Sequence, residues 1–348
     1  MKKLENRRTE LDFLRLAAIL VVIATHLCGG PVKSLDTASG TFAQLNCLRA
    51  AVTWDVPVFV MISGCLFLAP EKEVSIGKIF KKYIWHLAVC FAVWSAVFQV
   101  YYYVTSDTHL NLNGIFSEFL MGPYPFWYLF MLAGLYMIIP FLRSFAQDRK
   151  LVRYFLILFF VGEFLVNYGV RLPGIGPTLD QIIGKSNFHF ALGFTGYYLL
   201  GHYLSGSRIS LKKELLLYAA GIGCVIFTCA ATTWQSRAQG VYNEWFSKYL
   251  MPNVIVESTA LFVFFTKRVS QIRFSQRTRS ILKNLSGLGF GVYLVHALVI
   301  EGFNLMGITV LRFAPLPAAL ILTVAVYAIS LGLTWAIRQI PVIGKRIT

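Results

Sequence analysis

Long apolar segments recur along the whole chain, separated by short polar connections, most of them basic. Each segment has the roughly 17–25 residues that an α-helix needs to cross a bilayer. By number they run approximately 11–29, 45–69, 79–104, 125–142, 152–169, 188–205, 213–233, 249–267, 283–304 and 315–337. The pattern predicts an all-α polytopic membrane protein with about ten transmembrane helices. We expect residues 1–348 to form a single integral-membrane domain, with no appended extracytoplasmic domain.

The distribution of basic residues predicts which ends of the spans face the cytoplasm. Of the 32 Lys and Arg residues, 24 lie in the two terminal segments and in the connections after the second, fourth, sixth and eighth spans. The set assigned to the other side holds 7, Arg49 among them, and the remaining one is Arg15, inside the first span. Because cytoplasmic loops carry the excess of Lys and Arg, both termini are predicted to be cytoplasmic.

The composition supports a membrane protein and indicates which kinds of partner to expect. The chain is 57% hydrophobic and 14% charged, whereas a soluble domain has about 25% charged residues. A net charge of +16 would suggest nucleic acid in a soluble chain. Here the basic residues cluster between apolar segments, so we expect a lipid bilayer as partner and no nucleic acid. The basic N-terminus is similar to a signal peptide, but no cleavage site follows the first apolar segment, which we expect to be retained.

The six cysteines show no metal-ligand spacing, so the sequence predicts no metal site. Most of them fall inside apolar segments, where a free cysteine behaves as a small hydrophobic residue. Cys28 and Cys47 both lie near the predicted outer face. Nothing in the sequence indicates a disulfide between them.

A charged and a titratable residue share the first span. His26 follows Arg15 by eleven residues, which is three helical turns plus roughly 20° and about 16 Å along the axis. The two side chains therefore lie on one helix face. Ionisable groups inside a bilayer are costly and are functional-site candidates by default. The alternative for Arg15 is a structural ion pair with Asp12, three residues earlier on the same face.

Two more candidate site residues, His296 and Asp55, fall inside spans. His296 lies about 13 residues, or about 20 Å, from the inner edge of the ninth span, which is close to the depth of His26. The simpler interpretation of His26 and His296 is that both are core histidines bonded to backbone or hydroxyl groups.

Asp55 stands beside Pro57 in the second span and should not face lipid. It is a candidate to orient a histidine or to pair with an arginine.

Three lysines open the third span from the cytoplasmic side. Lys78, Lys81 and Lys82 have the i, i+3, i+4 spacing that places side chains on one helix face. Such a cluster can hold a polyanion, with nucleotide phosphates as the specific candidate. Ordinary inner-loop charge or contact with anionic lipid is the alternative. The chain has no glycine-rich phosphate motif of the Walker or Rossmann type.

Several motifs together resemble one family. Arg15 and His26 form an Arg-x10-His pattern in the first span. Residues 56–64 read VPVFVMISG, residues 126–129 FWYL, residues 194–201 FTGYYLLG and residues 286–296 SGLGFGVYLVH. Over nearly its whole length the chain resembles the acyltransferase 3 family of membrane acyltransferases. Within that family it most resembles the stand-alone type that O-acetylates enterobacterial common antigen. It departs from many members in having Leu132 where they have a Glu.

The resemblance implies a multi-pass enzyme of the bacterial cytoplasmic membrane. Its donor would be a cytoplasmic acyl-CoA, commonly acetyl-CoA, and its acceptor a hydroxyl of an extracytoplasmic glycan, a lipid-linked sugar or a related molecule. The basic cluster matches the one that opens the third span in the family, where arginine is usual.

From these observations we predict two sets of site residues. The catalytic set is His26 as general base with Arg15, His296 and Asp55. The donor-binding set is Lys78, Lys81, Lys82 and Arg15. We also expect His296 or Tyr293 to position the acceptor or to stabilise an oxyanion.

Two other classes of function remain open from the sequence. A transporter or flippase for a cell-envelope glycan precursor is the main alternative, because intramembrane charges also mark transport pathways. The absence of a visible internal repeat counts against it. A membrane-embedded sensor or partner subunit is the other.

Overall fold

The computed structural model describes residues 7–105, 111–186 and 192–348, and within these ranges the chain forms helices and no strands. The longer helices are α2 (Thr9–Lys33), α3 (Gly40–Val52), α4 (Asp55–Phe67), α6 (Trp85–Thr105), α8 (Trp127–Phe145), α9 (Arg149–Asn167), α12 (Leu211–Gln239), α13 (Pro252–Lys267), α14 (Gln276–Leu305) and α15 (Pro315–Arg338). The shorter ones include α5 (Ile76–Lys78), the π-helix η1 (Ile79–Ile84), α7 (Leu112–Met121), the 3-10 helix η2 (Tyr124–Phe126), α10 (Gly176–Ser186) and α11 (Phe194–Ser205). The prediction of an all-α polytopic membrane protein is confirmed.

Nine helical stretches in the described part of the chain are long and apolar enough to cross a membrane, with α3 and α4 counted as one stretch. They coincide with nine of the ten predicted spans. The sixth predicted span, 188–205, coincides with α11, which has 12 residues and is therefore about 18 Å long. Residues 187–191 lie outside the described residues.

The second predicted span is a broken helix. Pro57 has no backbone N–H and cannot continue the hydrogen-bond ladder of α3, so α3 ends at Val52 and α4 begins at Asp55. Two carbonyls freed at the break are bonded by side chains: the Thr53 hydroxyl donates to Ala50 at 3.1 Å, and the Trp54 indole to Ala51 at 3.0 Å. Non-helical backbone at membrane depth is tolerated only where protein covers it. The break places Asp55 at the buried start of a helix.

Two glycines bring α4 and α11 into backbone contact. A Cβ on Gly64 would lie 1.8 Å from the carbonyl oxygen of Tyr198, and a Cβ on Gly201 would lie 2.0 Å from that of Met61. Small residues at helix interfaces in membranes allow such close approach. The glycines of two of the sequence motifs therefore have a packing function.

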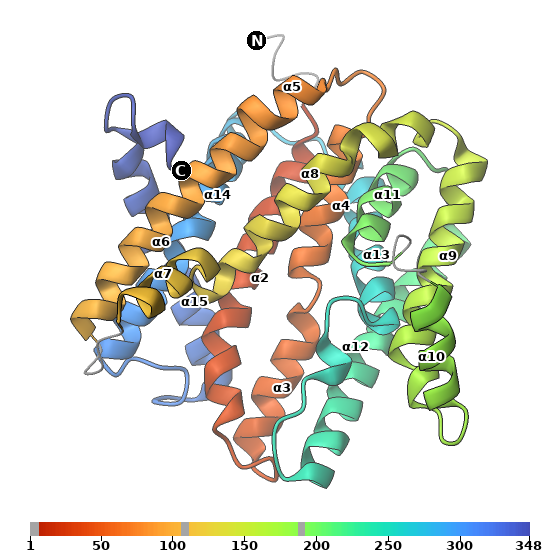
Figure 1. Ribbon diagram of the computed structural model, residues 1–348, viewed down its shortest axis with the longest axis horizontal. Coiled ribbons are helices and arrows are strands. Elements are labelled where there is room, and N and C mark those ends of the chain that lie inside the picture. Colours follow the sequence, from red (N-terminus) through yellow and green to blue (C-terminus); the bar gives the residue numbers. More distant parts are fainter. Residues whose placement is uncertain (1–6, 106–110, 187–191) are drawn as a thin grey trace.

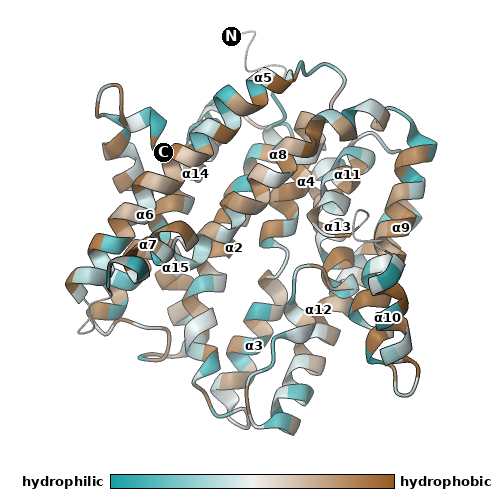
Figure 2. Ribbon diagram, viewed as in Figure 1, coloured by the Kyte–Doolittle hydropathy of each residue, from teal (hydrophilic) through white to brown (hydrophobic). Residues whose placement is uncertain are grey.

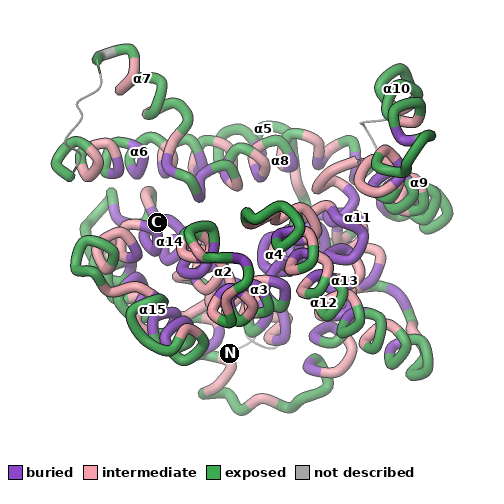
Figure 3. The backbone as a smooth tube through the Cα atoms, turned by 90° about the horizontal axis from the view of Figure 1, so that it is seen from below, coloured by how far each residue is buried: buried purple, intermediate pink, exposed green. Residues whose placement is uncertain are grey.

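The helices form two layers. In Figure 1, α6 and α8 run diagonally across the face formed by α2, α4 and α14. Seen along the perpendicular direction in Figure 3, α5, α6 and α8 lie in a row beside the main group of helices. Figure 2 shows hydrophobic residues along the midsections of the helices and hydrophilic residues gathered toward their ends, as a bilayer requires.

A disulfide joins α3 and α12 at the end of the molecule away from α5 (Figure 1). Cys47 of α3 pairs with Cys229 of α12, with their Cα atoms 5.0 Å apart. Cys28, the other outer cysteine, is buried and free. At the same end Arg237 donates to the carbonyl of Thr37 at 3.1 Å, joining α12 to the loop after α2.

Candidate active site

A cavity of about 380 Å³ lies between α2, α4, α8, α14 and the segment of η1 and α6. Arg15, Ile19 and His26 line it from α2, one helical face over three turns. The predicted common face of Arg15 and His26 is therefore confirmed, and that face borders an internal space. The polar and aromatic residues that complete the wall are Asp55, Phe59, Ser63, Tyr83, His86, Trp127, Tyr128, Tyr136, Tyr249, Ser286, Phe290, Tyr293, Arg338 and Thr348.

His26 lies between the cavity and two other rings. Its ring centre is 5.3 Å from that of His296 and 5.1 Å from that of Tyr124. The contact confirms that the two histidines lie at one depth. Tyr124 belongs to η2 and is 45% exposed, so His26 contacts an aromatic side chain that reaches the protein surface.

His296 does not line the cavity. It is fully buried in α14, and its Nδ1 lies 2.5 Å from the backbone carbonyl oxygen of Tyr293. Tyr293 does line the cavity, but its hydroxyl donates to the carbonyl of Pro125. The expectation that either side chain donates to an oxyanion is therefore not supported, because both donors are already bonded to backbone carbonyls.

Asp55 lies in the cavity wall at the start of α4. It is 1% exposed, and its Oδ1 accepts a hydrogen bond of 2.7 Å from the backbone N–H of Val56. Tyr249, which also lines the cavity, lies beside its carboxyl group. Asp55 is thus in a position to contact the contents of the cavity.

The structure adds Arg49, which we had counted among the outer-loop charges. Its Nε donates to the Tyr242 hydroxyl at 3.0 Å, and its Nη1 lies 3.4 Å from the carbonyl oxygen of Thr25. Its Nη2 lies 3.6 Å from a carboxyl oxygen of Glu244. Its side chain is only 12% exposed. Its position inside the apolar segment 45–69 was the sequence signal that could have identified it.

Asp12 is the ion-pair partner of Arg15, but it also has other hydrogen-bond donors. The two side chains lie 3.3 Å apart. Asp12 also pairs with Arg7, whose Nη2 is at 2.8 Å, and accepts a bond of 2.9 Å from the hydroxyl of Ser286. Because Asp12 has these other donors, the guanidinium of Arg15 is available to an anion in the cavity.

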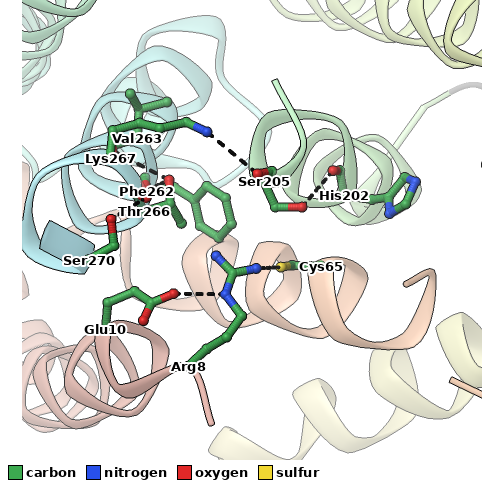
Figure 4. A network of polar contacts seen from close by, with 10 residues as sticks. All are labelled: Arg8, Glu10, Cys65, His202, Ser205, Phe262, Val263, Thr266, Lys267 and Ser270. Atoms are coloured by element: carbon green, nitrogen blue, oxygen red, sulfur yellow. Dashed lines mark hydrogen bonds and ion pairs between the residues drawn. The ribbon is translucent and has the colours of Figure 1, made fainter. Parts of the chain in front are cut away.

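Arg15 also lines a second, larger cavity of about 720 Å³. This second cavity lies at the N-terminal end of α2, and its basic lining includes Arg7, Arg8 and Arg149. Figure 4 shows part of its wall, where Arg8 Nη1 donates to Cys65 at 2.8 Å and Arg8 Nε to Glu10 at 2.7 Å. Arg15 is the side chain that lies in the walls of both cavities.

The predicted lysine cluster lies near these cavities without lining them. Lys78, Lys81 and Lys82 are exposed on α5 and η1. Lys72, which the sequence did not single out, is half-buried in the preceding loop, with its Nζ 3.5 Å from the centre of the Phe67 ring. Burial, together with the charges of neighbouring Lys78, Arg15, Lys82 and Arg143, lowers the pKa of Lys72 to about 8. Basic groups that lie close enough to lower each other's pKa form a suitable site for an anion.

No group of three or more His, Cys, Asp or Glu side chains in the described ranges is arranged to hold a metal ion. The groups that line the two cavities include imidazole rings, carboxyl groups, aromatic hydroxyls and several guanidinium groups.

Comparisons with known proteins identify one family. The family model described as an acyltransferase domain matches residues 8–335, which is most of the chain and includes every residue of both predicted site sets. The match supports the family and does not extend to the enterobacterial common antigen type. No curated protein and no solved structure was found to match the chain.

Proposed function

This chain belongs to the acyltransferase domain family, and from that premise we propose that it moves an acyl group, acetyl in the first instance, from cytoplasmic acyl-CoA to a hydroxyl of an extracytoplasmic glycan or related acceptor. The observation that carries the proposal is a single cavity with Arg15 at one end of its α2 wall and His26 at the other. Through Arg15 it adjoins the larger basic cavity.

The donor is proposed to enter from the side of the chain termini. Its nucleotide phosphates would interact with the basic cluster of Lys72, Lys78, Lys81, Lys82 and Arg143 and with the larger cavity. The thin pantetheine arm would extend past Arg15 through the smaller cavity. About 16 Å of helix separates Arg15 from His26, which is a span suited to an extended arm. The thioester carbonyl would then lie near His26.

His26 is proposed as the general base. An imidazole has an ordinary pKa of about 6.5 and can take a proton from a hydroxyl near neutral pH. As the acceptor oxygen attacks the thioester carbon, its proton passes to His26. When the carbon–sulfur bond breaks, CoA leaves as a thiolate and takes that proton from the imidazolium. A thiol with a pKa of about 8.5 leaves readily without a strong acid.

The acceptor is proposed to approach from the opposite side, past Tyr124 and Trp127. Tyr124 contacts His26, and Trp127 lines the cavity while remaining 39% exposed. Trp127 also stacks on Tyr249 with ring centres 5.7 Å apart. Aromatic faces of this kind suit the apolar face of a sugar ring, and Asp55 in the same wall could accept a hydrogen bond from a second acceptor hydroxyl.

Sealed vesicles of known orientation provide the test. Radiolabelled acetyl-CoA is supplied on the side of the chain termini, and a bacterial cell-envelope glycan extract on the other side. Acetylated glycan on the far side supports the proposal. Product formed only when both substrates share the donor side would mean an inward-facing transferase, and label that never leaves acetyl-CoA would exclude acyl transfer. The flippase alternative is not favoured, because the family is one of acyltransferases.

A further inference from the structure

The hydrogen bonding of His296 determines where its ring proton lies. Its Nδ1 is 2.5 Å from the Tyr293 carbonyl oxygen, and the carbonyl of Val292 lies beside it as well. A carbonyl group only accepts hydrogen bonds, so Nδ1 must carry the hydrogen. In a neutral imidazole the other nitrogen is then a bare acceptor. His296 is fully buried, and burial disfavours the charged ring.

That bare acceptor has no partner of its own. Nε2 of His296 is buried, and no group in the described residues donates a hydrogen bond to it. Buried polar atoms are nearly always hydrogen-bonded, and each exception calls for an explanation. The neighbouring rings are Tyr293, whose hydroxyl is bonded to Pro125, and His26. Of these two rings, only that of His26 has an N–H that can donate a hydrogen bond to Nε2.

The separation of the two histidine rings fits a direct bond. Their centres are 5.3 Å apart, with an angle of 34° between the ring planes. An N–H···N bond of about 2.9 Å between rings of about 1.1 Å radius places the centres about 5.1 Å apart. The observed separation of the two ring centres is therefore close to the one that such a bond requires.

We propose that His296 is a positioning residue: its Nε2 accepts a hydrogen bond from one ring nitrogen of His26 and thereby keeps the other nitrogen of His26 unprotonated and directed into the cavity. The inference rests on the proposed role of His26 as general base. When His26 takes the acceptor proton, its other N–H remains bonded to a neutral acceptor, which stabilises the imidazolium. His296 itself neither gains nor loses a proton.

Asp55, the candidate that the sequence offered for orienting a histidine, is engaged elsewhere. Its Oδ1 accepts the Val56 N–H, and Tyr249 lies beside its carboxyl group. Thr25 of α2 lies beside the carboxyl group as well, so Asp55 is held in the cavity wall by α4, Thr25 and Tyr249. The two rings of His26 and His296, in contrast, contact each other directly.

Two variants of His296 distinguish the effect of its hydrogen bond from the effect of its packing. His296→Gln keeps an acceptor oxygen near the position of Nε2, whereas His296→Phe keeps a planar ring and removes both nitrogens. With purified protein, acetyl-CoA and envelope glycan extract, His296→Phe should lower kcat by about 10–100-fold, the range typical of groups that orient a reacting ligand. The KM for acetyl-CoA should stay the same. His296→Gln should recover most of the loss.

The tautomer of His26 gives a second, independent measurement. Nitrogen-15 NMR of protein labelled at histidine distinguishes protonated from bare ring nitrogens, and the His26 signals are assigned by their loss in His26→Gln. Wild type should show one tautomer, and His296→Phe a mixture of two. A kcat of His296→Phe equal to wild type, a folded His296→Gln as slow as His296→Phe, or an unchanged tautomer would each overturn the proposal. If wild type transfers no acyl group, the proposed function fails, while the tautomer measurement still tests the hydrogen bond.

Discussion

At the scale of single residues, the position of His26 leads to a direct test. His26→Ala should lower acyl transfer by about 10²–10⁴-fold, because a positioned general base contributes that much. Transfer of radiolabelled acetyl from acetyl-CoA measures the loss, and gel filtration checks that the protein remains folded.

A matched control lies two residues further along the same helix. Cys28 is buried and free, and two residues place it about 200° around the helix from His26. Cys28→Ala should therefore retain activity close to wild type, which would also exclude a covalent acyl intermediate at this cysteine. Activity of His26→Ala within a few fold of wild type would contradict the general-base role.

Arg15 can be tested against the simpler explanation that it neutralises Asp12. Arg15→Ala should raise the KM for acetyl-CoA at least about tenfold, since a hydrogen bond to a charged group contributes about 1.5–3 kcal/mol. If Arg15 served only the ion pair, Asp12→Asn and Arg15→Ala would have equal effects and the double variant no further effect. We expect instead that only Arg15→Ala changes donor use strongly.

At the scale of elements, the stretch from the end of α4 through η1 carries the lysines of the donor-binding set. Neutralising Lys78, Lys81 and Lys82 together should weaken binding of acyl-CoA by roughly tenfold, because exposed pairs contribute at most about 1 kcal/mol each. The wild-type affinity should also fall with added salt. Calorimetry with a non-hydrolysable thioether analogue of acetyl-CoA measures both effects. If the triple variant and wild type bound the analogue equally well at low and high salt, the three lysines would not bind the donor. They would then only help to set the orientation of the chain in the membrane.

Lys72 adds a pH dependence to the same segment. Its pKa is lowered to about 8 by burial and by neighbouring cations, so it is charged below pH 8 and loses its proton as the pH rises. Because phosphates bind the charged form, affinity for the thioether analogue should decline between pH 7.5 and about 9. Lys72→Arg should abolish the decline, since a guanidinium stays charged. If the affinity of Lys72→Arg still declined over this pH range, a group other than Lys72 would be responsible for the decline.

The packing of α4 on α11 can be tested through its glycines. Gly64→Ala would place a Cβ 1.8 Å from the Tyr198 carbonyl oxygen, so the helices must separate, at a cost of about 1–3 kcal/mol. Thermal unfolding in detergent should show a lower midpoint. Gly223 in α12 has open space around its Cα, and Gly223→Ala should leave the midpoint unchanged or raise it slightly. Equal midpoints for the two variants would show that α4 and α11 do not pack this closely.

At the scale of the whole molecule, the orientation of the chain in the membrane determines from which side the donor and the acceptor enter. The basic bias of 24 residues against 7 predicts both termini in the cytoplasm. In the structure the disulfide joins α3 to α12, which lie in Figure 1 at the end of the molecule away from α5, and disulfides persist on the oxidising side of a membrane. The two observations favour the same orientation.

Reporter fusions test that orientation. Alkaline phosphatase fused after Thr348 should be inactive, and the same enzyme inserted at Gly240, the end of α12, should be active. An active C-terminal fusion would reverse the orientation and exchange the proposed donor and acceptor sides. Alkylation of the cysteines with and without reductant, followed by mass spectrometry, checks the disulfide independently.

The sequence by itself determined what depends on neighbours along the chain. Apolar segments of spanning length specify membrane helices because a bilayer requires internal backbone hydrogen bonds. The helical period places Arg15 and His26 on one face, and the structure confirms it. Equal depth of His26 and His296 also followed from counting residues along two spans. The clustering of motifs identified the family, which the comparison confirms.

Only the tertiary structure decided what depends on residues distant in sequence. It placed His296 behind His26 and engaged the Tyr293 hydroxyl with Pro125. It brought Lys72 near the positive charge of Arg15 and paired Cys47 with Cys229 across 182 residues. The physical reason is that periodicity fixes the face a side chain occupies on its own helix, while the packing of helices against one another determines which faces meet and which of them enclose a cavity.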